Sequence, residues 1–223
     1  MKKTIIITGA SDGLGKSIAY ELKEHKLILI AKDEEKLRKI SEKLECKYYI
    51  CDLKDYNQIN TIINNIDEVD ILINNAGIWL AGDLEENSFE QISNCIDVNT
   101  KAPIYMTKAV LPIMRKNKSG LIINVCSQSS FDNDDFSSVY NASKWAMRGF
   151  NRSIQKVLSK DNIKVTGFYP GFMQTRLFEK AGNNYDTSTG LETPKVAKAI
   201  RFIIECEEDI IIPEFGIKDI ENY

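Results

Sequence analysis

Tyr140 and Lys144 are the two residues whose types and spacing most directly suggest chemistry. Residues four apart on an α-helix share one face, so this spacing brings a phenol and an ammonium together. The hydroxyl of an unperturbed tyrosine has a pKa of about 10, too high for an efficient base at neutral pH. A fixed ammonium beside it favours the tyrosinate. The pair predicts a proton donor or acceptor, although such a pair is more often a packed aromatic beside a solvated lysine.

A glycine-rich turn, TGASDGLG, occupies residues 8–15, between an apolar run and a stretch of helical periodicity. Gly9 allows a tight turn, and Gly13 and Gly15 let backbone and ligand approach closely. The following helix would offer its N-terminal amides to a pyrophosphate. This strand–turn–helix context predicts dinucleotide binding, for which a glycine-rich turn alone is weak evidence.

Short apolar runs rich in isoleucine and valine alternate with longer amphipathic stretches along the chain. This alternation favours parallel strands joined by right-handed crossovers, and continuous apolar strands indicate a sheet covered on both faces. We predict one α/β domain over residues 1–223, a doubly wound Rossmann-type parallel sheet of about seven strands with helices on both faces. The expected strands are 4–8, 27–30, 47–51, 70–73, 121–125, 164–168 and 209–212, and the expected helices include 14–24, 34–44, 56–66 and 139–158.

Residues 172–193 form the longest segment without clear periodicity. A polar stretch of this length in a compact domain is either functional or disordered. In a doubly wound fold it would lie beyond the carboxyl ends of the strands, where ligands bind. We predict a mobile substrate lid, with a plain surface loop as the alternative.

The composition argues against several classes of protein. A net charge of −3 with scattered basic residues leaves no footprint for nucleic acid or an anionic membrane, and no apolar stretch approaches a membrane span. A single histidine, His25, and the absence of a CxxC pair predict no metal site. Five cysteines without a signal peptide suggest reduced thiols. We therefore expect a cytoplasmic protein, with His25 exposed and Cys126 packed.

Several further motifs occur in a fixed order after the glycine-rich turn. In chain order they are Asp52 in CDL, Asn74 to Gly77 in NNAG, Asn99, Ser127, Tyr140 and Lys144 in YNASK, Pro170 with Gly171, and Thr175. Together they resemble the short-chain dehydrogenase/reductase family, with its TGxxxGxG, NNAG and YxxxK signatures, from about residue 4 to about residue 175. Each of these residues alone could equally have a structural role, as a turn former or a helix cap. Their co-occurrence in order favours the functional reading.

The resemblance implies a catalytic group made of Asn99, Ser127, Tyr140 and Lys144. Tyr140 would be the general acid or base, and Lys144 would also hydrogen-bond the nicotinamide ribose. Ser127 would hold the substrate oxygen. Asn99, near Pro103 where a long helix is expected to be interrupted, would hold a water in the proton relay. The cofactor would carry the hydride.

The resemblance also implies a nicotinamide cofactor. The matching positions for cofactor binding are Gly9, Ser11, Asp12, Gly13, Leu14, Gly15, Ala31, Lys32, Asp52, Leu53, Asn75, Ala76, Gly77, Tyr140, Lys144, Pro170, Gly171 and Thr175. Members that prefer NAD place an acidic residue near Ala31, whereas members that prefer NADP carry a basic residue at the position of Lys32. Asp12 opposes this, because many NADP users have a second basic residue there. We predict NADP over NAD.

We therefore predict an NADP(H)-dependent oxidoreductase that moves a hydride between nicotinamide and a small or medium carbonyl or alcohol. Apolar side chains in the 172–193 segment suggest apolar substrate contact, and the acidic 131–136 stretch argues against a strongly anionic substrate. The family implies a homo-oligomer, a tetramer or dimer paired through the helices of Asn99 and Tyr140. One alternative is a catalytically silent NAD(P)-binding sensor or scaffold, which usually lacks the Tyr or Lys. A sugar-nucleotide epimerase or dehydratase would need a longer C-terminal substrate domain.

Overall fold

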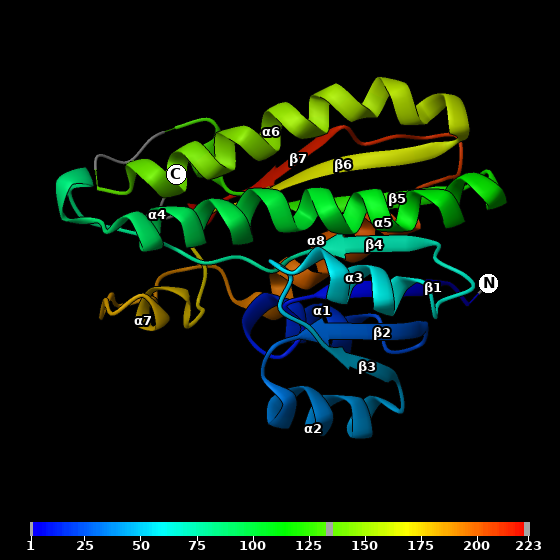
Figure 1. Ribbon diagram of the computed structural model, residues 1–223, viewed down its shortest axis with the longest axis horizontal. Helices are drawn as coiled ribbons and strands as arrows, with labels where there is room; N and C mark the ends of the chain where they lie inside the picture. The colour runs from blue at the N-terminus through cyan, green and yellow to red at the C-terminus, as the bar shows by residue number, and fades with distance from the viewer. Residues whose placement is uncertain (1, 133–135, 221–223) are drawn as a thin grey trace.

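A computed structural model describes residues 2–132 and 136–220 and shows one seven-stranded parallel sheet. The strand order is β3-β2-β1-β4-β5-β6-β7, so the chain first builds outward from β1 and then crosses back to place β4 on its other side (Figure 1). This confirms the predicted doubly wound α/β fold. The strands are β1 (Thr4–Thr8), β2 (Lys26–Ala31), β3 (Lys47–Ile50), β4 (Ile71–Asn74), β5 (Gly120–Val125), β6 (Ile163–Pro170) and β7 (Glu214–Ile217).

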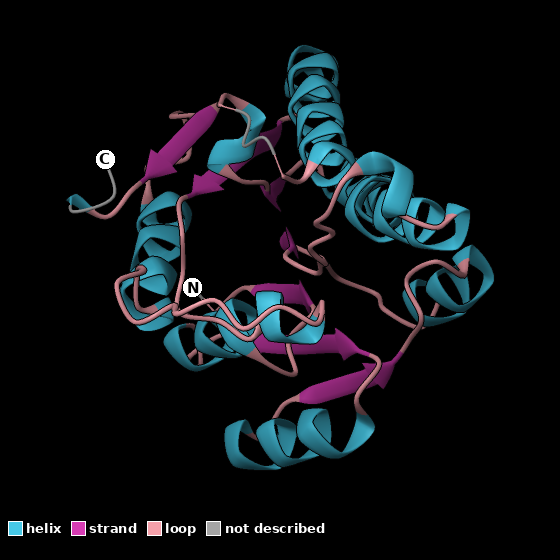
Figure 2. Cartoon of the chain, turned by 90° about the vertical axis from the view of Figure 1, so that its left-hand side faces the viewer, coloured by secondary structure: helices cyan, strands magenta, loops and turns pink. Residues whose placement is uncertain are grey.

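Helices cover both faces of the sheet because successive strand residues point to opposite sides (Figure 2). On β1, Ile5 and Ile7 pack against α1, α2 and α8, whereas Ile6 packs on the side of α3 and α5. The helices are α1 (Gly13–Glu21), α2 (Glu34–Leu44), α3 (Tyr56–Ile63), α4 (Phe89–Ile96), α5 (Ala102–Asn117), α6 (Ser138–Leu158), α7 (Leu177–Lys180) and α8 (Thr193–Glu205). Short 3₁₀ turns are η1 (Leu84–Glu86), η3 (Gln128–Ser130) and η4 (Ser159–Asp161), and a π turn, η2 (Asp97–Lys101), joins α4 to α5.

The last strand lies five residues later than predicted. The apolar run 209–212 is irregular, with Ile210 and Ile211 exposed, and β7 begins only after Pro213. The Pro213 carbonyl accepts from Gly167 N, but proline has no N–H to donate to a ladder. Pairing with β6 therefore starts at Glu214 opposite Gly167, and the predicted strand at 209–212 is wrong.

The 172–193 segment leaves the sheet after β6, and its far end folds back against its own beginning. Met173 bridges Leu191 in parallel fashion, and Gln174 N donates to the Leu191 carbonyl. The residues between form an excursion that contains α7 and lies beyond the carboxyl ends of the strands (Figure 1). Within residues 2–132 and 136–220 no helix has the length and apolar character that a membrane crossing requires.

Candidate active site

A cleft of about 450 Å³ lies at the carboxyl edge of the sheet, where β1 and β4 carry the chain to opposite sides. Doubly wound folds bind ligands at this switch point. Most of the predicted cofactor residues line it: Gly9, Ser11, Asp12, Gly13, Leu14, Ala31, Lys32, Asp52, Leu53, Asn75, Ala76, Gly77, Tyr140, Lys144 and Thr175. The fold thus brings residues that are far apart in sequence together around a single cleft.

The glycine-rich turn lies so close to the end of β4 that side chains would not fit. A Cβ on Gly15 would lie 2.3 Å from the Gly9 carbonyl oxygen and 2.5 Å from Asn75 Nδ2. Gly9 has φ +65° and would place a Cβ 2.8 Å from the Ala76 Cα. The first N–H groups of α1 have no acceptor within the helix, and such groups favour an anion. Backbone packing and helix direction therefore fit a dinucleotide pyrophosphate.

Tyr140 and Lys144 lie on the inner face of α6, and both are buried. The Lys144 ammonium nitrogen is 5.5 Å from the centre of the Tyr140 ring and 3.4 Å from the Val125 carbonyl oxygen, to which it donates. Among residues 2–132 and 136–220 no carboxylate pairs with Lys144, and burial is unusual for such a lysine. The end of β5 therefore holds this ammonium in place beside the phenol.

Asn99 lies within the π turn η2, next to the cleft rather than in its lining. Its Oδ1 accepts from Ile78 N at 2.9 Å, and its Nδ2 donates to the Ile78 carbonyl oxygen at 2.9 Å and to Ser143 Oγ at 3.0 Å. A Cβ on Gly77 would lie 3.3 Å from Asn99 Oδ1 and 3.7 Å from Lys144 Nζ. Asn99 thus ties α4–α5, the NNAG loop and α6 together beside Lys144.

Ser127, the fourth predicted catalytic residue, follows β5 and caps η3. Its Oγ accepts from Ser129 N at 3.1 Å and donates to Ser129 Oγ at 3.2 Å. Its neighbour Cys126 lines the cleft, and Ser130 Oγ binds the Lys144 carbonyl oxygen at 3.0 Å. The η3 turn is therefore attached to α6 at the level of Lys144.

Three predicted cofactor residues lie outside the lining of the cleft. Gly15 packs behind the turn against Gly9, as described above. Pro170 ends β6, and Gly171 N donates to the Ile217 carbonyl oxygen at 2.8 Å, toward β7. Met173 and Thr175 face the cleft instead.

Charged side chains gather at the end of the cleft formed by the ends of β2 and β3. Lys32 Nζ lies 2.9 Å from Asp52 Oδ2. Burial by itself would raise the pKa of the Asp52 carboxyl, but the hydrogen bonds from Lys32 and the Lys54 N–H outweigh it and lower the pKa. Lys36, Arg176 and Lys180 also line the cleft. Cationic side chains at this end fit a phosphate group.

Aromatic side chains belong to the same buried cluster as Tyr140. The Trp79 ring lies 4.7 Å from the Phe178 ring and 5.5 Å from the Tyr185 ring, centre to centre. Trp79 and Tyr140 belong to one buried cluster against which Leu177 and Phe178 pack.

The acidic 131–136 stretch is described in part. Residues 133–135 lie outside the described part of the chain, and Phe131 packs against Tyr169 and Arg148.

Sequence reasoning missed part of the cleft wall. Ile78, Asn94, Val98 and Met173 line it, as do Lys36, Arg176 and Lys180. Asn94 and Val98 are four residues apart, a spacing that places both on one face of a helix. The cations on the 172–193 segment gave no such signal, because only the tertiary fold brings α7 to the glycine-rich turn.

A second cleft of about 760 Å³ lies between α1 and the 172–193 segment. It shares Asp12, Gly13, Thr175 and Arg176 with the first cleft, but Tyr140 and Lys144 do not line it. The smaller cleft is therefore the candidate active site.

Comparison with known proteins gives a consistent result. Residues 3–186 match the family model described as short chain dehydrogenase. An uncharacterized oxidoreductase of Staphylococcus epidermidis is 29% identical over 227 residues, covering 98% of both chains. Among solved structures, the closed form of serine dehydrogenase complexed with NADP+ has a TM-score of 0.92 at 25% identity and covers 99% of this chain and 96% of its own. A short-chain dehydrogenase from Sphingobium yanoikuyae in complex with NADPH has a TM-score of 0.86 at 25% identity, with 96% and 86% covered.

The chain belongs to the short-chain dehydrogenase/reductase family, and it is an oxidoreductase.

Proposed function

We propose that the protein transfers a hydride between NADP(H) and a small or medium carbonyl or alcohol, with Tyr140 as the general acid or base. The observation that carries this proposal is the buried Tyr140–Lys144 pair at the wall of the switch-point cleft. The Lys144 ammonium nitrogen lies 5.5 Å from the centre of the phenol ring, so the two side chains that this proposal pairs for proton transfer are adjacent in the wall of the cleft. Tyr140 can thus give up a proton to a carbonyl oxygen and regain it.

The nicotinamide, when bound, supplies or accepts the hydride. The glycine-rich turn and α1 would hold the pyrophosphate, and Lys144 would hold the nicotinamide ribose as well as orient Tyr140. Ser127 would bind the substrate oxygen once it releases Ser129 Oγ. The protein's part in the chemistry is then binding, orientation and proton transfer.

Asn99 supports the proton relay through its backbone in this proposal. Its side-chain amide is already bound to Ile78 and Ser143, so it has little capacity left for a water. Pro103 lacks the N–H that an α-helix would direct to the Asn99 carbonyl four residues before it. That carbonyl is the acceptor through which Asn99 would hold a water beside Lys144.

Two observations support NADP as the cofactor. Lys32, Lys36, Arg176 and Lys180 line the end of the cleft beside Ala31, where NAD users of the family carry a carboxylate. The two related structures described above contain NADP+ and NADPH. The aromatic cluster beside Tyr140 supports a carbonyl substrate with an apolar substituent.

A panel of aldehydes and ketones tests this function, with NADPH and NADH supplied in separate assays and followed by nicotinamide absorbance. We expect at least one carbonyl to be reduced, faster with NADPH than with NADH at limiting cofactor. Absence of turnover with every carbonyl, together with absence of oxidation of the matching alcohols with NADP+, contradicts the proposal.

A further inference from the structure

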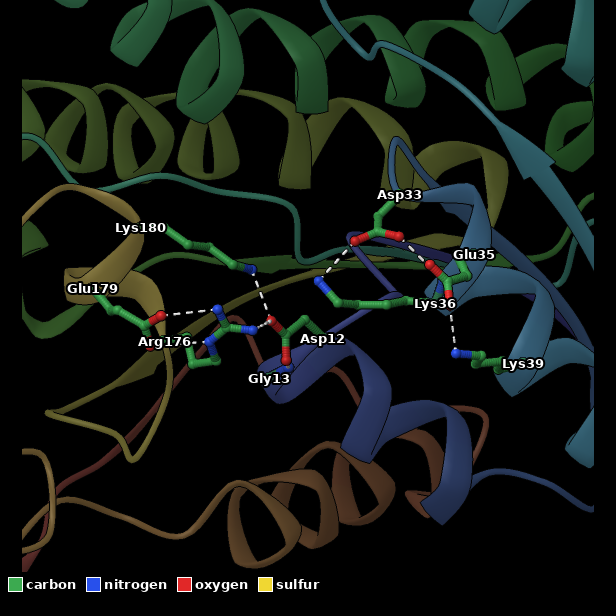
Figure 3. Close-up of polar contacts among 9 residues, drawn as sticks. All are labelled: Asp12, Gly13, Asp33, Glu35, Lys36, Lys39, Arg176, Glu179 and Lys180. Carbon is green, nitrogen blue, oxygen red and sulfur yellow. Dashed lines mark hydrogen bonds and ion pairs between the residues drawn. The ribbon is translucent and has the colours of Figure 1, made fainter.

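Asp12, the residue that opposes NADP binding by sequence, is neutralised by the 172–193 segment. Its Oδ1 accepts from Gly13 N at 2.8 Å and caps α1, while its Oδ2 lies 2.9 Å from Lys180 Nζ and 3.8 Å from Arg176 Nη1 (Figure 3). Burial by itself would raise the pKa of the Asp12 carboxyl, but the ion pair with Lys180 and the hydrogen bond from Gly13 N outweigh it and lower the pKa. The cation that the glycine-rich turn lacks is therefore present on α7.

Asp33 has the same arrangement at the start of α2. Its Oδ1 accepts from Lys36 N at 3.1 Å and caps the helix, while its Oδ2 lies 2.7 Å from Lys36 Nζ (Figure 3). The two ion pairs are neighbours, because Lys180 acts electrostatically on Asp33, and Asp12 acts on Lys36. In both pairs one oxygen serves the helix cap and the other holds a lysine. Either lysine can therefore leave its carboxylate without uncapping a helix.

Both lysines are free enough to change partner. Their side chains are about half exposed, 53% for Lys180 and 45% for Lys36. Ion pairs as exposed as these contribute little, whereas a phosphate monoester carries nearly two charges and three acceptor oxygens. Arg176 is less free, because Glu179 holds its guanidinium through two hydrogen bonds of 3.0 and 2.8 Å.

We propose that Lys180, assisted by Lys36, binds the 2′-phosphate of NADP, and that the 172–193 segment therefore contributes directly to cofactor choice. Without the phosphate, Lys180 pairs with Asp12 on the glycine-rich turn. With it, the phosphate takes over Lys180 and holds the segment at the cleft. This inference rests on the proposed nucleotide binding, but it concerns residues that the family motifs do not include.

Equilibrium binding of NADPH and NADH to the purified full chain tests the proposal without turnover, by nucleotide fluorescence. We expect Lys180→Ala to weaken NADPH binding about tenfold or more and NADH binding less than about twofold. Asp12→Asn keeps the cap oxygen but removes the competing charge, so it should tighten NADPH binding about two- to fivefold, more than it tightens NADH binding. Lys39→Ala is the matched control, because Lys39 pairs with Glu35 on the same helix as Lys36 but outside the cleft lining.

Limited digestion with chymotrypsin gives a second readout, because Lys180→Ala leaves the aromatic cleavage sites intact. Saturating NADPH should protect the 172–193 segment of the wild type more than saturating NADH does, and this difference should vanish in Lys180→Ala. If Lys180→Ala leaves the ratio of the two Kd values unchanged, or weakens both nucleotides equally, the role of Lys180 is wrong while the proposed function stands. If the wild type binds neither nucleotide, both fail.

Discussion

The Lys144 ammonium nitrogen lies 5.5 Å from the centre of the Tyr140 ring, one helical turn away on α6. Tyr140→Phe keeps the ring and removes only the hydroxyl. We expect kcat to fall by about 10²- to 10⁴-fold, because the proton donor is lost, while NADPH binding changes less than about threefold. Steady-state kinetics and fluorescence titration measure the two effects.

Lys144→Ala is the companion variant, because this lysine is assigned two roles. It should reduce kcat and also weaken cofactor binding, in contrast to Tyr140→Phe. A Phe variant that keeps more than a small fraction of the wild-type kcat would show that another group transfers the proton.

The sequence predicted most of the fold because local patterns and topology agree. The α2 helix matches its predicted bounds, and the other predicted helices and the first six strands differ by up to three residues at their ends. The last strand was misplaced because Pro213 and the pairing with Gly167, rather than apolar content, decide where β7 begins. Periodicity carries no information on such a register.

Residues of the candidate site could be predicted where they belong to motifs that are contiguous in sequence. They could not be predicted where only tertiary contacts bring them to the cleft. Residues of the glycine-rich turn, with Tyr140 and Lys144 of α6, line the candidate cleft. His25 was expected to be exposed, yet its side chain is 13% exposed and its Nδ1 accepts from Lys3 N, because the chain start folds against it. The contact of Lys180 with Asp12 joins residues 168 positions apart, which no local pattern reveals.

Lys32 provides a separate test of the cofactor assignment. The Lys32 ammonium nitrogen lies 2.9 Å from Asp52 Oδ2, and Lys32 lines the cleft together with Ala31. If it also contacts the 2′-phosphate, Lys32→Ala should weaken NADPH binding by about 1.5–3 kcal/mol and barely affect NADH. The preference should shrink as salt rises, because an exposed ion contact is screened.

Adding Ala31→Asp to Lys32→Ala should shift the preference further toward NADH, because a carboxylate there accepts ribose hydroxyls and repels the phosphate. Values of kcat/KM for both cofactors in the wild type and the two variants give the outcome. A cofactor ratio that Lys32→Ala leaves unchanged would remove Lys32 from the phosphate site.

Oligomerisation is a further prediction, resting on the family rather than on a contact within the chain. We expect a homo-oligomer, a dimer or tetramer paired through α4, α5 and α6. Met147, one apolar residue of α6, is buried inside the subunit against Cys126 and Tyr169, so it is not available for pairing. Ala146 is exposed on the same helix. Light scattering at micromolar concentration measures the mass, and a monomer would contradict the prediction.

Cys126 provides a test of burial near the active site. Burial raises the pKa of its thiol to about 11, and Asn151 Nδ2 donates to its sulfur at 3.4 Å. We expect the thiol to be unreactive toward a disulfide reagent in the folded protein, because the thiolate is the reactive form. Cys126→Ser should therefore leave the number of fast-reacting thiols unchanged and lower the total in denaturant from five to four.

The same thiol makes stability depend on pH. The folded thiol has a higher pKa than the unfolded thiol at about 8.5, so the unfolded state loses its proton first. Stability is fully present below that pH and declines as pH rises toward the folded value. Urea unfolding from pH 8 to 10 should show a smaller decline for Cys126→Ser than for the wild type. An equal decline in the two proteins would mean that other groups cause the loss of stability. Cys51 is one such group, because burial also raises the pKa of its thiol to about 11.

Gly15 and Gly149 form a matched pair for testing how tightly the glycine-rich turn is packed. A Cβ on Gly15 would lie 2.3 Å from the Gly9 carbonyl oxygen, whereas a Cβ on Gly149, exposed on α6, meets nothing within 4 Å. The methyl group that Gly15→Ala adds must displace Gly9 and Asn75 from their present positions. We therefore expect the variant to destabilise the fold by about 1–3 kcal/mol and to weaken binding of both nucleotides. Gly149→Ala should instead stabilise by about 0.5–1 kcal/mol, because it reduces the freedom of the unfolded chain. Urea unfolding and nucleotide titration on both variants compare the two sites. Equal stability and unchanged Kd values for Gly15→Ala would mean that the turn relaxes without cost, and that its close approach to β4 does not shape the cofactor site.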